Sequence, residues 1–302
     1  MNEQALSFEC EGAPLVGVLH KTSAPARRGV LIVVGGGPQY RAGGHRQLVT
    51  WSRQLAQLGY PVFRFDYRGM GDSGGTFAGF EQVDDDIRAA TDRFFAEVPS
   101  LREVVLWGEC DGASAILFYA YRDRRVSGAV LLNPWARTES LRARAVLRHY
   151  YLKRLLEPSF WGKLVSGRLN PLASLRSIVQ TVRQSRAAVG GSQVSAVDNL
   201  SAALPRNAPL PDLLLAGLHR FQGSLMLVMS GRDLIAREFD ELMRDSPAWR
   251  AEMAGKAVTR HDLPDGDHTF SSRAQREQVI AWVLAWLSAT SADAATPAGS
   301  PR

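Results

Sequence analysis

The sequence has little cysteine and no long hydrophobic stretch. Its two cysteines, Cys10 and Cys110, are too few for a disulfide framework, and their surroundings suggest no metal cluster. No apolar run reaches the roughly 18 residues that a membrane-spanning helix needs. The N-terminal residues lack the basic and apolar regions of a signal peptide. We therefore expect a protein of the reducing cytoplasm, with no metal ion, no cofactor and no transmembrane segment.

The hydrophobic residues, 45% of the 302, are enough for a sizeable core. Two short strands at residues 6–9 and 15–20 flank a Gly-Ala-Pro turn and predict a hairpin. Apolar strands are then expected at residues 30–34, 61–66, 104–107 and 126–132. Segments with helical spacing alternate with them, at residues 46–58, 83–96 and 113–121. Such alternation, with strands that are apolar throughout, predicts a mostly parallel sheet with helices on both faces, an α/β fold.

The alternation stops at Pro134 and resumes near residue 221. Between these points the sequence has helix-like segments and no convincing strand. Further strands are expected at residues 224–230 and 257–263, and further helices at 236–243 and 275–287. The chain is thus predicted to be one interrupted domain, with a first core part at 1–134, a helical cap insertion at 135–220, a second core part at 221–288 and a disordered tail at 289–302.

Residues 108–112 read Gly-Glu-Cys-Asp-Gly between an apolar strand and a helix. This is the nucleophile-elbow pattern Gly-x-Ser-x-Gly with cysteine in place of serine. A nucleophile on so sharp a turn needs small neighbours, which Gly108 and Gly112 provide. The helix that begins at Asp111 directs its N–H groups at the sulfur, which predicts a lowered pKa for the thiol. From the five residues alone, a buried and unreactive cysteine is an equally good interpretation.

Two polar residues that follow the predicted strands at 224–230 and 257–263 complete a catalytic triad with Cys110. Asp233 and His268 each stand just after a predicted strand, where the carboxyl ends of parallel strands share one edge of the sheet. We expect Cys110 to attack, His268 to take and return its proton, and Asp233 to orient the imidazole. Asp265 and Asp267 are closer to His268 in sequence, but a neighbour in the same loop seldom reaches back to the ring.

Acyl transfer also needs hydrogen-bond donors for the oxyanion. One is expected to be the N–H of Asp111, directly after the nucleophile. The other is expected in the glycine-rich loop after the strand at 30–34. Pro38 has no N–H, so Gly37 is the first choice and Gly36 the second. The alternative is that this loop serves only close packing.

The predicted cap carries most of the positive charge. Between residues 136 and 190 there are eleven basic and two acidic residues, a net charge of +9, against +6 for the whole chain, which leaves −3 for the rest. Because the charge is localised, we do not expect nucleic-acid binding. Three explanations of this positive charge stay open. It can belong to a solvated helix face, or contact an anionic membrane surface. It can also steer an anionic acyl donor, such as acyl-CoA or an acyl carrier protein, toward Cys110. The candidates for substrate binding are Gln39, Tyr40, His45, Trp135, Arg142 and Arg148.

Three motifs resemble those of α/β-hydrolases of the Ser-aminopeptidase and lysophospholipase-like branch: residues 66–73 (DYRGMGDS), 231–233 (GRD) and 266–270 (GDHTF). The motifs at residues 36–41 (GGPQYR), 45–47 (HRQ) and 110–111 (CD) are most similar to the bacterial group called exosortase A system-associated hydrolase 1. The resemblance covers residues 5–288 and implies an α/β-hydrolase fold and a hydrolase activity. Cysteine in place of serine is shared with dienelactone hydrolases and polyhydroxyalkanoate synthases.

These observations predict a Cys-His-Asp α/β-hydrolase that cleaves or transfers an acyl group from an ester or thioester through an acyl-cysteine intermediate. A thioester reacts readily with amines, alcohols and thiols, which favours acyl transfer. Two other classes of function stay open. One is a non-catalytic protein that uses the pocket for binding, and the other is a membrane-surface or scaffold protein that acts through the basic cap.

Overall fold

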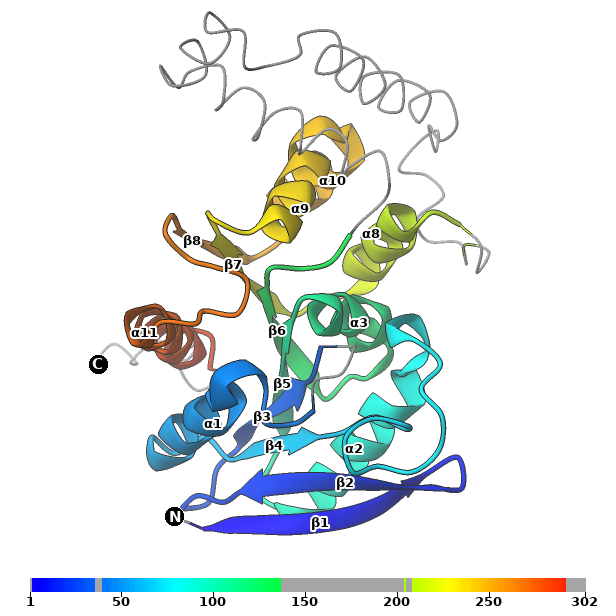
Figure 1. Ribbon diagram of the computed structural model, residues 1–302, viewed down its shortest axis with the longest axis vertical. Coiled ribbons are helices and arrows are strands. Elements are labelled where there is room, and N and C mark those ends of the chain that lie inside the picture. The colour runs from blue at the N-terminus through cyan, green and yellow to red at the C-terminus, as the bar shows by residue number, and fades with distance from the viewer. Residues whose placement is uncertain (1, 36–39, 137–203, 205–207, 292–302) are drawn as a thin grey trace, which may run out of the picture.

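An eight-stranded sheet forms the centre of the protein in the computed structural model, which describes residues 2–35, 40–136, 204 and 208–291 (Figure 1). The strand order is β1-β2-β4-β3-β5-β6-β7-β8. Strand β2 runs antiparallel to both β1 and β4, and the other neighbouring pairs are parallel. The strands are β1 (Glu3–Cys10), β2 (Ala13–His20), β3 (Arg28–Val33), β4 (Val62–Phe65), β5 (Glu103–Glu109), β6 (Val126–Leu132), β7 (Ser224–Ser230) and β8 (Val258–Leu263).

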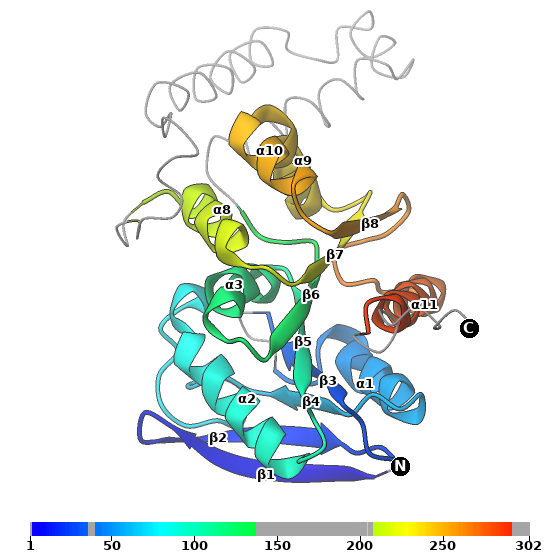
Figure 2. The same ribbon diagram turned by 180° about the vertical axis from the view of Figure 1, so that it is seen from behind.

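Helices cover both faces of the sheet (Figures 1 and 2). One face packs against α1 (Gln47–Gln57) and α11 (Arg273–Ala289). The other packs against five helices: α2 (Asp84–Glu97), α3 (Asp111–Tyr119), α8 (Leu210–Arg220), α9 (Leu234–Asp245) and α10 (Pro247–Ala254). Together with the strand order, this confirms the predicted α/β-hydrolase fold, with a mostly parallel sheet and helices on both faces.

Strand β3 shows why the central strands are apolar throughout. Val30 and Ile32 pack with α1 and α11, whereas Leu31 and Val33 pack with the helices of the opposite face. All four are at most 1% exposed, because successive side chains of a strand point to opposite faces and both faces are covered. The strand is therefore rigidly held, and so is the point at its carboxyl end where the following loop begins.

The expected hairpin, strands and alternating helices are present within a few residues of their predicted limits. One helix was not predicted: α10 begins at Pro247, directly after α9, and the Ser246 hydroxyl accepts a hydrogen bond from the N–H of Trp249. A proline in the first turn with a serine cap is a favourable helix start. The eight residues of α10 are short enough for their pattern to be overlooked in the sequence.

Most of the predicted cap, residues 137–203 and 205–207, lies outside the described residues, as does the predicted tail from residue 292. The last helix of the cap range, α8, packs against α3 and buries Leu214 and Leu218 in the core of the sheet. Helix α11 continues to Ala289, two residues beyond its predicted end. In the part of the chain that the structure describes, no helix has the length and apolarity to cross a membrane.

Candidate active site

Cys110 occupies a sharp turn between β5 and α3, with φ 56° and ψ −126°. A non-glycine residue with positive φ is uncommon and is typically found where function requires it. A Cβ atom on Gly108 would lie 2.6 Å from the carbonyl carbon of Gly112, and one on Gly112 would lie 2.6 Å from the carbonyl oxygen of Val33. Neither position has room for a side chain, so both glycines of the motif are required by the turn that presents Cys110.

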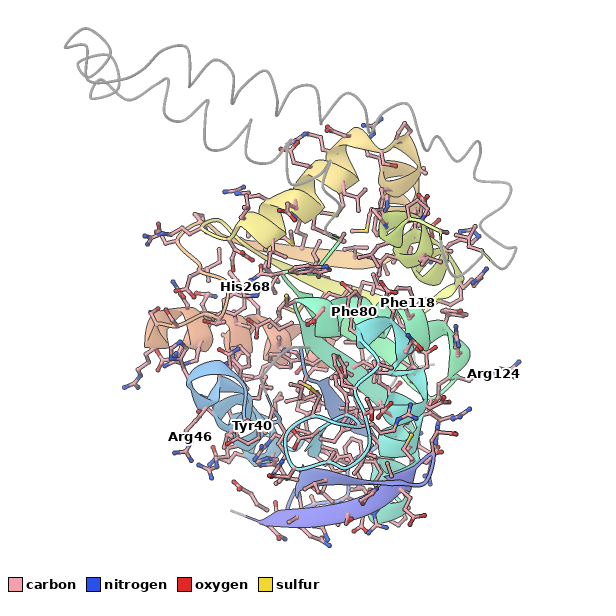
Figure 3. All side chains as sticks on the ribbon, turned by 45° about the vertical axis from the view of Figure 1, so that its right-hand side comes forward. Tyr40, Arg46, Phe80, Phe118, Arg124 and His268 are labelled. Carbon is pink, nitrogen blue, oxygen red and sulfur yellow. The ribbon has the colours of Figure 1, made fainter. Side chains whose placement is uncertain are left out.

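The structure brings together the three residues predicted to form a triad. His268 lies on the loop after β8 (Figure 3), and its ring is hydrogen-bonded to the Cys110 thiol. Its Nδ1 atom lies 2.7 Å from Oδ2 of Asp233, at the end of β7. Because Nδ1 is engaged by Asp233, Nε2 is the ring nitrogen available to the sulfur. This is the geometry that a proton transfer from Cys110 to His268 needs.

Asp233 is itself held in place by the backbone. It is the N-cap residue of α9, and its carboxylate accepts hydrogen bonds from the N–H groups of Ile235 (3.1 Å) and Ala236 (3.3 Å). Asp267, by contrast, accepts from the N–H of Ser271 at 2.9 Å. The carboxylate that contacts the imidazole is thus that of Asp233, while Asp267 stabilises the turn that follows His268.

Asn133, for which the sequence alone predicts no role, fixes the position of the His268 loop. Asn133 follows β6 with φ 45° and is fully buried. Its Nδ2 atom donates to the Ser230 hydroxyl (3.0 Å) and to the main-chain oxygen of His268 (3.1 Å). Its Oδ1 atom accepts from the N–H of Ser230 (2.8 Å). One amide therefore joins the ends of β6 and β7 to the loop that carries the histidine.

The prediction of a lowered pKa for Cys110 is wrong. Burial raises the pKa of this thiol, and the opposing hydrogen bonds from His268 and from the N–H of Asp111 do not outweigh it. Burial alone would lower the pKa of His268, but its hydrogen bonds to Asp233 and Cys110 raise it. The interaction between the two groups thus lowers the pKa of the thiol and helps to raise that of the imidazole, which reaches about 10.

A cavity of about 100 Å³ opens at the sulfur. Its polar lining comes from Cys110, His268, Asp111 and Glu109. Apolar walls are supplied by Ile32, Leu48 and Trp107 from three different elements. A small apolar cavity with convergent polar groups and groups of shifted pKa is typical of an active site.

The described part of the predicted oxyanion site is consistent with its role. The N–H of Asp111 is hydrogen-bonded to the Cys110 sulfur, so it lies beside the nucleophile. Gly37 and Gly36 lie outside the described residues. The backbone leading into their loop is fixed, because the hydroxyl of Tyr67 donates to the carbonyl oxygen of Val34 at 2.6 Å.

Three of the residues predicted to bind substrate, Tyr40, His45 and Trp135, belong to the described part of the chain, and they do not line the cavity. Tyr40 is 48% exposed and lies near α1 under the guanidinium of Arg41 (Figure 3). His45 is exposed in the short helical turn Gly44–Arg46, η1. Trp135 donates its main-chain N–H to the carbonyl oxygen of Cys110 at 3.1 Å, so it positions backbone near the elbow. Gln39, Arg142 and Arg148 lie outside the described residues.

We found no metal-binding arrangement among the described residues: no three His, Cys, Asp or Glu side chains are grouped to hold an ion. What the site can do chemically follows from its own side chains. It presents a thiol, a base oriented by a carboxylate, and a main-chain donor at one point of a small cavity. These are the parts required for nucleophilic attack on a carbonyl carbon.

Comparisons with known proteins identify the family and the fold of the chain. The model of the family described as serine aminopeptidase, S33, matches residues 25–200. A search of curated proteins found no match. An esterase of Pyrococcus furiosus has a similar structure, with a TM-score of 0.61 and 15% identity over 95% of this chain and 90% of that one. A thermostable carboxyl esterase of Bacillus coagulans gives 0.60 and 14% identity, over 96% and 99% of the two chains.

A third similar structure is larger. The acylaminoacyl peptidase of Pyrococcus horikoshii matches with a TM-score of 0.62 and 14% identity, over 99% of this chain but 43% of that one. This chain therefore corresponds to one part of the peptidase. At such low identities the three structures establish a shared fold.

Proposed function

The chain belongs to the serine aminopeptidase S33 family and is an α/β-hydrolase enzyme, and we propose that it cleaves or transfers acyl groups from esters or thioesters through an acyl-Cys110 intermediate. The observation that carries this proposal is the contact of one imidazole with both Cys110 and Asp233. The family is named for serine, and in this chain the elbow position is cysteine. The chemistry proposed is accordingly that of a thiol.

The first half-reaction forms the thioester. The Cys110 sulfur attacks the carbonyl carbon of the substrate while its proton moves to Nε2 of His268. The carbonyl oxygen becomes an oxyanion, which the N–H of Asp111 is placed to receive. The intermediate then collapses, the bond to the leaving alcohol or thiol breaks, and His268 returns the proton to that leaving group. Asp233 holds the ring in the required tautomer throughout.

The second half-reaction releases the acyl group. A water molecule, alcohol, amine or thiol attacks the acyl-Cys110 carbonyl and gives a proton to His268. The carbon–sulfur bond breaks, and His268 returns the proton to the sulfur. Since a thioester is readily attacked by amines, alcohols and thiols as well as by water, the cysteine favours acyl transfer over simple hydrolysis.

We also propose an anionic acyl donor, such as acyl-CoA or an acyl carrier protein. This rests on the net charge of +9 between residues 136 and 190 in the sequence. Charge of one sign near a site raises the association rate of an oppositely charged substrate. We propose further that the protein is cytoplasmic and that it belongs to the group called exosortase A system-associated hydrolase 1. The competing uses of the charge are peripheral contact with an anionic membrane and a scaffold role without catalysis.

The test of the acyl-cysteine mechanism uses Cys110→Ala and Cys110→Ser with matched esters and thioesters. The alanine variant should lose turnover while its melting temperature stays close to that of the wild type. The serine variant should keep weak activity, because His268, Asp233 and the donor at Asp111 remain. Cys10→Ala is the matched control, since Cys10 is buried at the end of β1 and has no contact with the cavity. Full activity in Cys110→Ala would refute the proposal.

A further inference from the structure

A second polar pair lies directly behind the nucleophile. Glu109 is the last residue of β5 and precedes Cys110, and Gln47 is the first residue of α1. The Gln47 Nε2 atom donates to Glu109 Oε2 at 2.6 Å. The other oxygen of each side chain, Oε1 in both cases, is enclosed and has no hydrogen-bond partner in the described part of the chain. Gln47 is only 1% exposed.

The two enclosed oxygens lack a hydrogen-bond donor, and a proton on the Glu109 carboxyl would supply one. A carboxylate oxygen and an amide oxygen are both acceptors, so neither satisfies the other. A buried polar atom without a partner is costly. If Glu109 carries a proton on Oε1, that atom becomes a donor, and Oε1 of Gln47, the other enclosed oxygen without a partner, can be its acceptor. The two planar groups are already joined through Nε2 and Oε2, so this second bond closes a ring of two parallel hydrogen bonds.

The charges around Glu109 also favour its neutral form. Burial is the main cause that raises the pKa of Glu109, to about 8, and the charges of Asp233 and Asp267 act in the same direction. The charge of His268 and the hydrogen bond from Gln47 oppose the shift without cancelling it. The charges of both Asp233 and His268 thus act on Glu109, which directly precedes Cys110 in the chain.

We propose that Glu109 is a positioning residue of the active site, a neutral acid that shares its proton with Gln47 and so adds no carboxylate charge of its own beside the Asp233–His268 pair. This inference rests on the proposed acyl-cysteine mechanism for its consequence. In the acyl-enzyme, His268 must be neutral to accept a proton from the attacking nucleophile. If Glu109 gave up its proton, its negative charge would raise the pKa of the imidazole further, and a smaller fraction of the base would be neutral.

The decisive variant is Glu109→Gln, because its amide reproduces both bonds of the ring but does not titrate. A carboxyl whose pKa is raised in the folded state makes the protein less stable as pH rises from its unfolded value, about 4.3, toward its folded value. The wild type should carry this loss, up to about pH 8. The melting temperature of Glu109→Gln, relative to wild type, should therefore rise between about pH 5 and pH 8.

Two further variants separate the effect of the titrating carboxyl from the effect of lost hydrogen bonds. Glu109→Leu leaves both polar atoms of Gln47 without partners, so it should melt lower overall, yet it should show the same upward trend with pH because it too lacks the titrating group. Glu103→Gln is the matched control on the same strand, where the carboxylate pairs with Nε of Arg28 at 2.6 Å. It should be less stable than wild type, without the upward trend.

The kinetic arm follows the ratio of kcat/KM in Glu109→Gln to that in wild type. This ratio should increase severalfold as pH rises through about 8, the value at which Glu109 ionises in the wild type. For Glu103→Gln the ratio should stay flat. A ratio that falls with pH, or a melting-temperature difference that does not change with pH, would overturn the proposal. The stability arm needs no substrate, so it can succeed or fail independently of the acyl-cysteine mechanism.

Discussion

The Nδ1 atom of His268 lies 2.7 Å from Oδ2 of Asp233, a residue 35 positions earlier in the chain. The two residues follow β7 and β8, which are parallel neighbours at the edge of the sheet. The carboxylate is fixed by two main-chain N–H groups of α9, and the histidine loop is fixed by Asn133. Hydrogen bonds between side chains and the main chain therefore hold both members of the Asp233–His268 pair in place.

Asp233→Asn should lower kcat by about 10⁴-fold, the loss seen when the corresponding aspartate of a serine protease is changed. The amide has no negative charge to stabilise an imidazolium, and its NH2 group can donate to Nδ1 and so select the wrong tautomer. Asp267→Asn is the comparison, since its carboxylate contacts Ser271 and not the ring. An unchanged rate in Asp233→Asn together with a large loss in Asp267→Asn would show that the wrong carboxylate has been assigned.

Alkylation of Cys110 by iodoacetamide should accelerate as pH rises into the alkaline range, because burial raises the pKa of this thiol. The hydrogen bond from His268 lowers that pKa, so His268→Ala should move the alkylation profile to higher pH. Cys10, whose pKa burial raises to about 11, is the internal control and should react last. A profile that moves to lower pH in His268→Ala would contradict the hydrogen bond.

Asn133→Ala should lower kcat roughly 10- to 100-fold, because small displacements of a catalytic group have effects of that size. Loss of the buried amide bonds should also reduce the free energy of unfolding by about 1–3 kcal/mol. Ser230→Ala removes one of the amide's partners but leaves its bond to the His268 main chain, so its effect on kcat should be smaller. If the two variants lose activity equally, Asn133 acts on stability and not on the histidine loop.

Much of the site was predictable from the sequence because its residues follow strand ends. The predicted strands indicated where β5, β7 and β8 end, and Cys110, Asp233 and His268 follow those ends. The two glycines of the elbow have a local steric cause, so their pattern was visible without the fold. Asp233 was distinguishable from Asp267 because only a residue from the neighbouring strand can approach the ring from the side.

The rest depended on contacts between distant segments. Asn133 follows a strand like many other asparagines, and its role arises only when Ser230 and the His268 loop meet it. Glu109 occupies a variable position of the elbow motif, and its partner, Gln47, lies 62 positions away in the chain. The pKa of Cys110 was predicted with the wrong sign because burial is a property of the packed structure, whereas the helix start is visible in the sequence.

The basic insertion gives a prediction about salt. If it attracts an anionic acyl donor, kcat/KM for that donor should fall as ionic strength rises, because salt screens such attraction. The value should fall again when Arg142, Arg144 and Arg148 are changed together to Gln. A neutral ester of the same acyl group should show neither effect. Equal responses of the two donors would show that the charge does not serve substrate capture.

The mass of the intact enzyme, quenched in acid during turnover of an activated ester or thioester, tests the central claim most directly. The mechanism predicts a mass increase equal to one acyl group, located by peptide mapping on Cys110 and absent from Cys110→Ala. Asp233→Asn should form the same adduct more slowly. An acyl group found on another residue, or turnover that persists in Cys110→Ala, would contradict an acyl-cysteine intermediate.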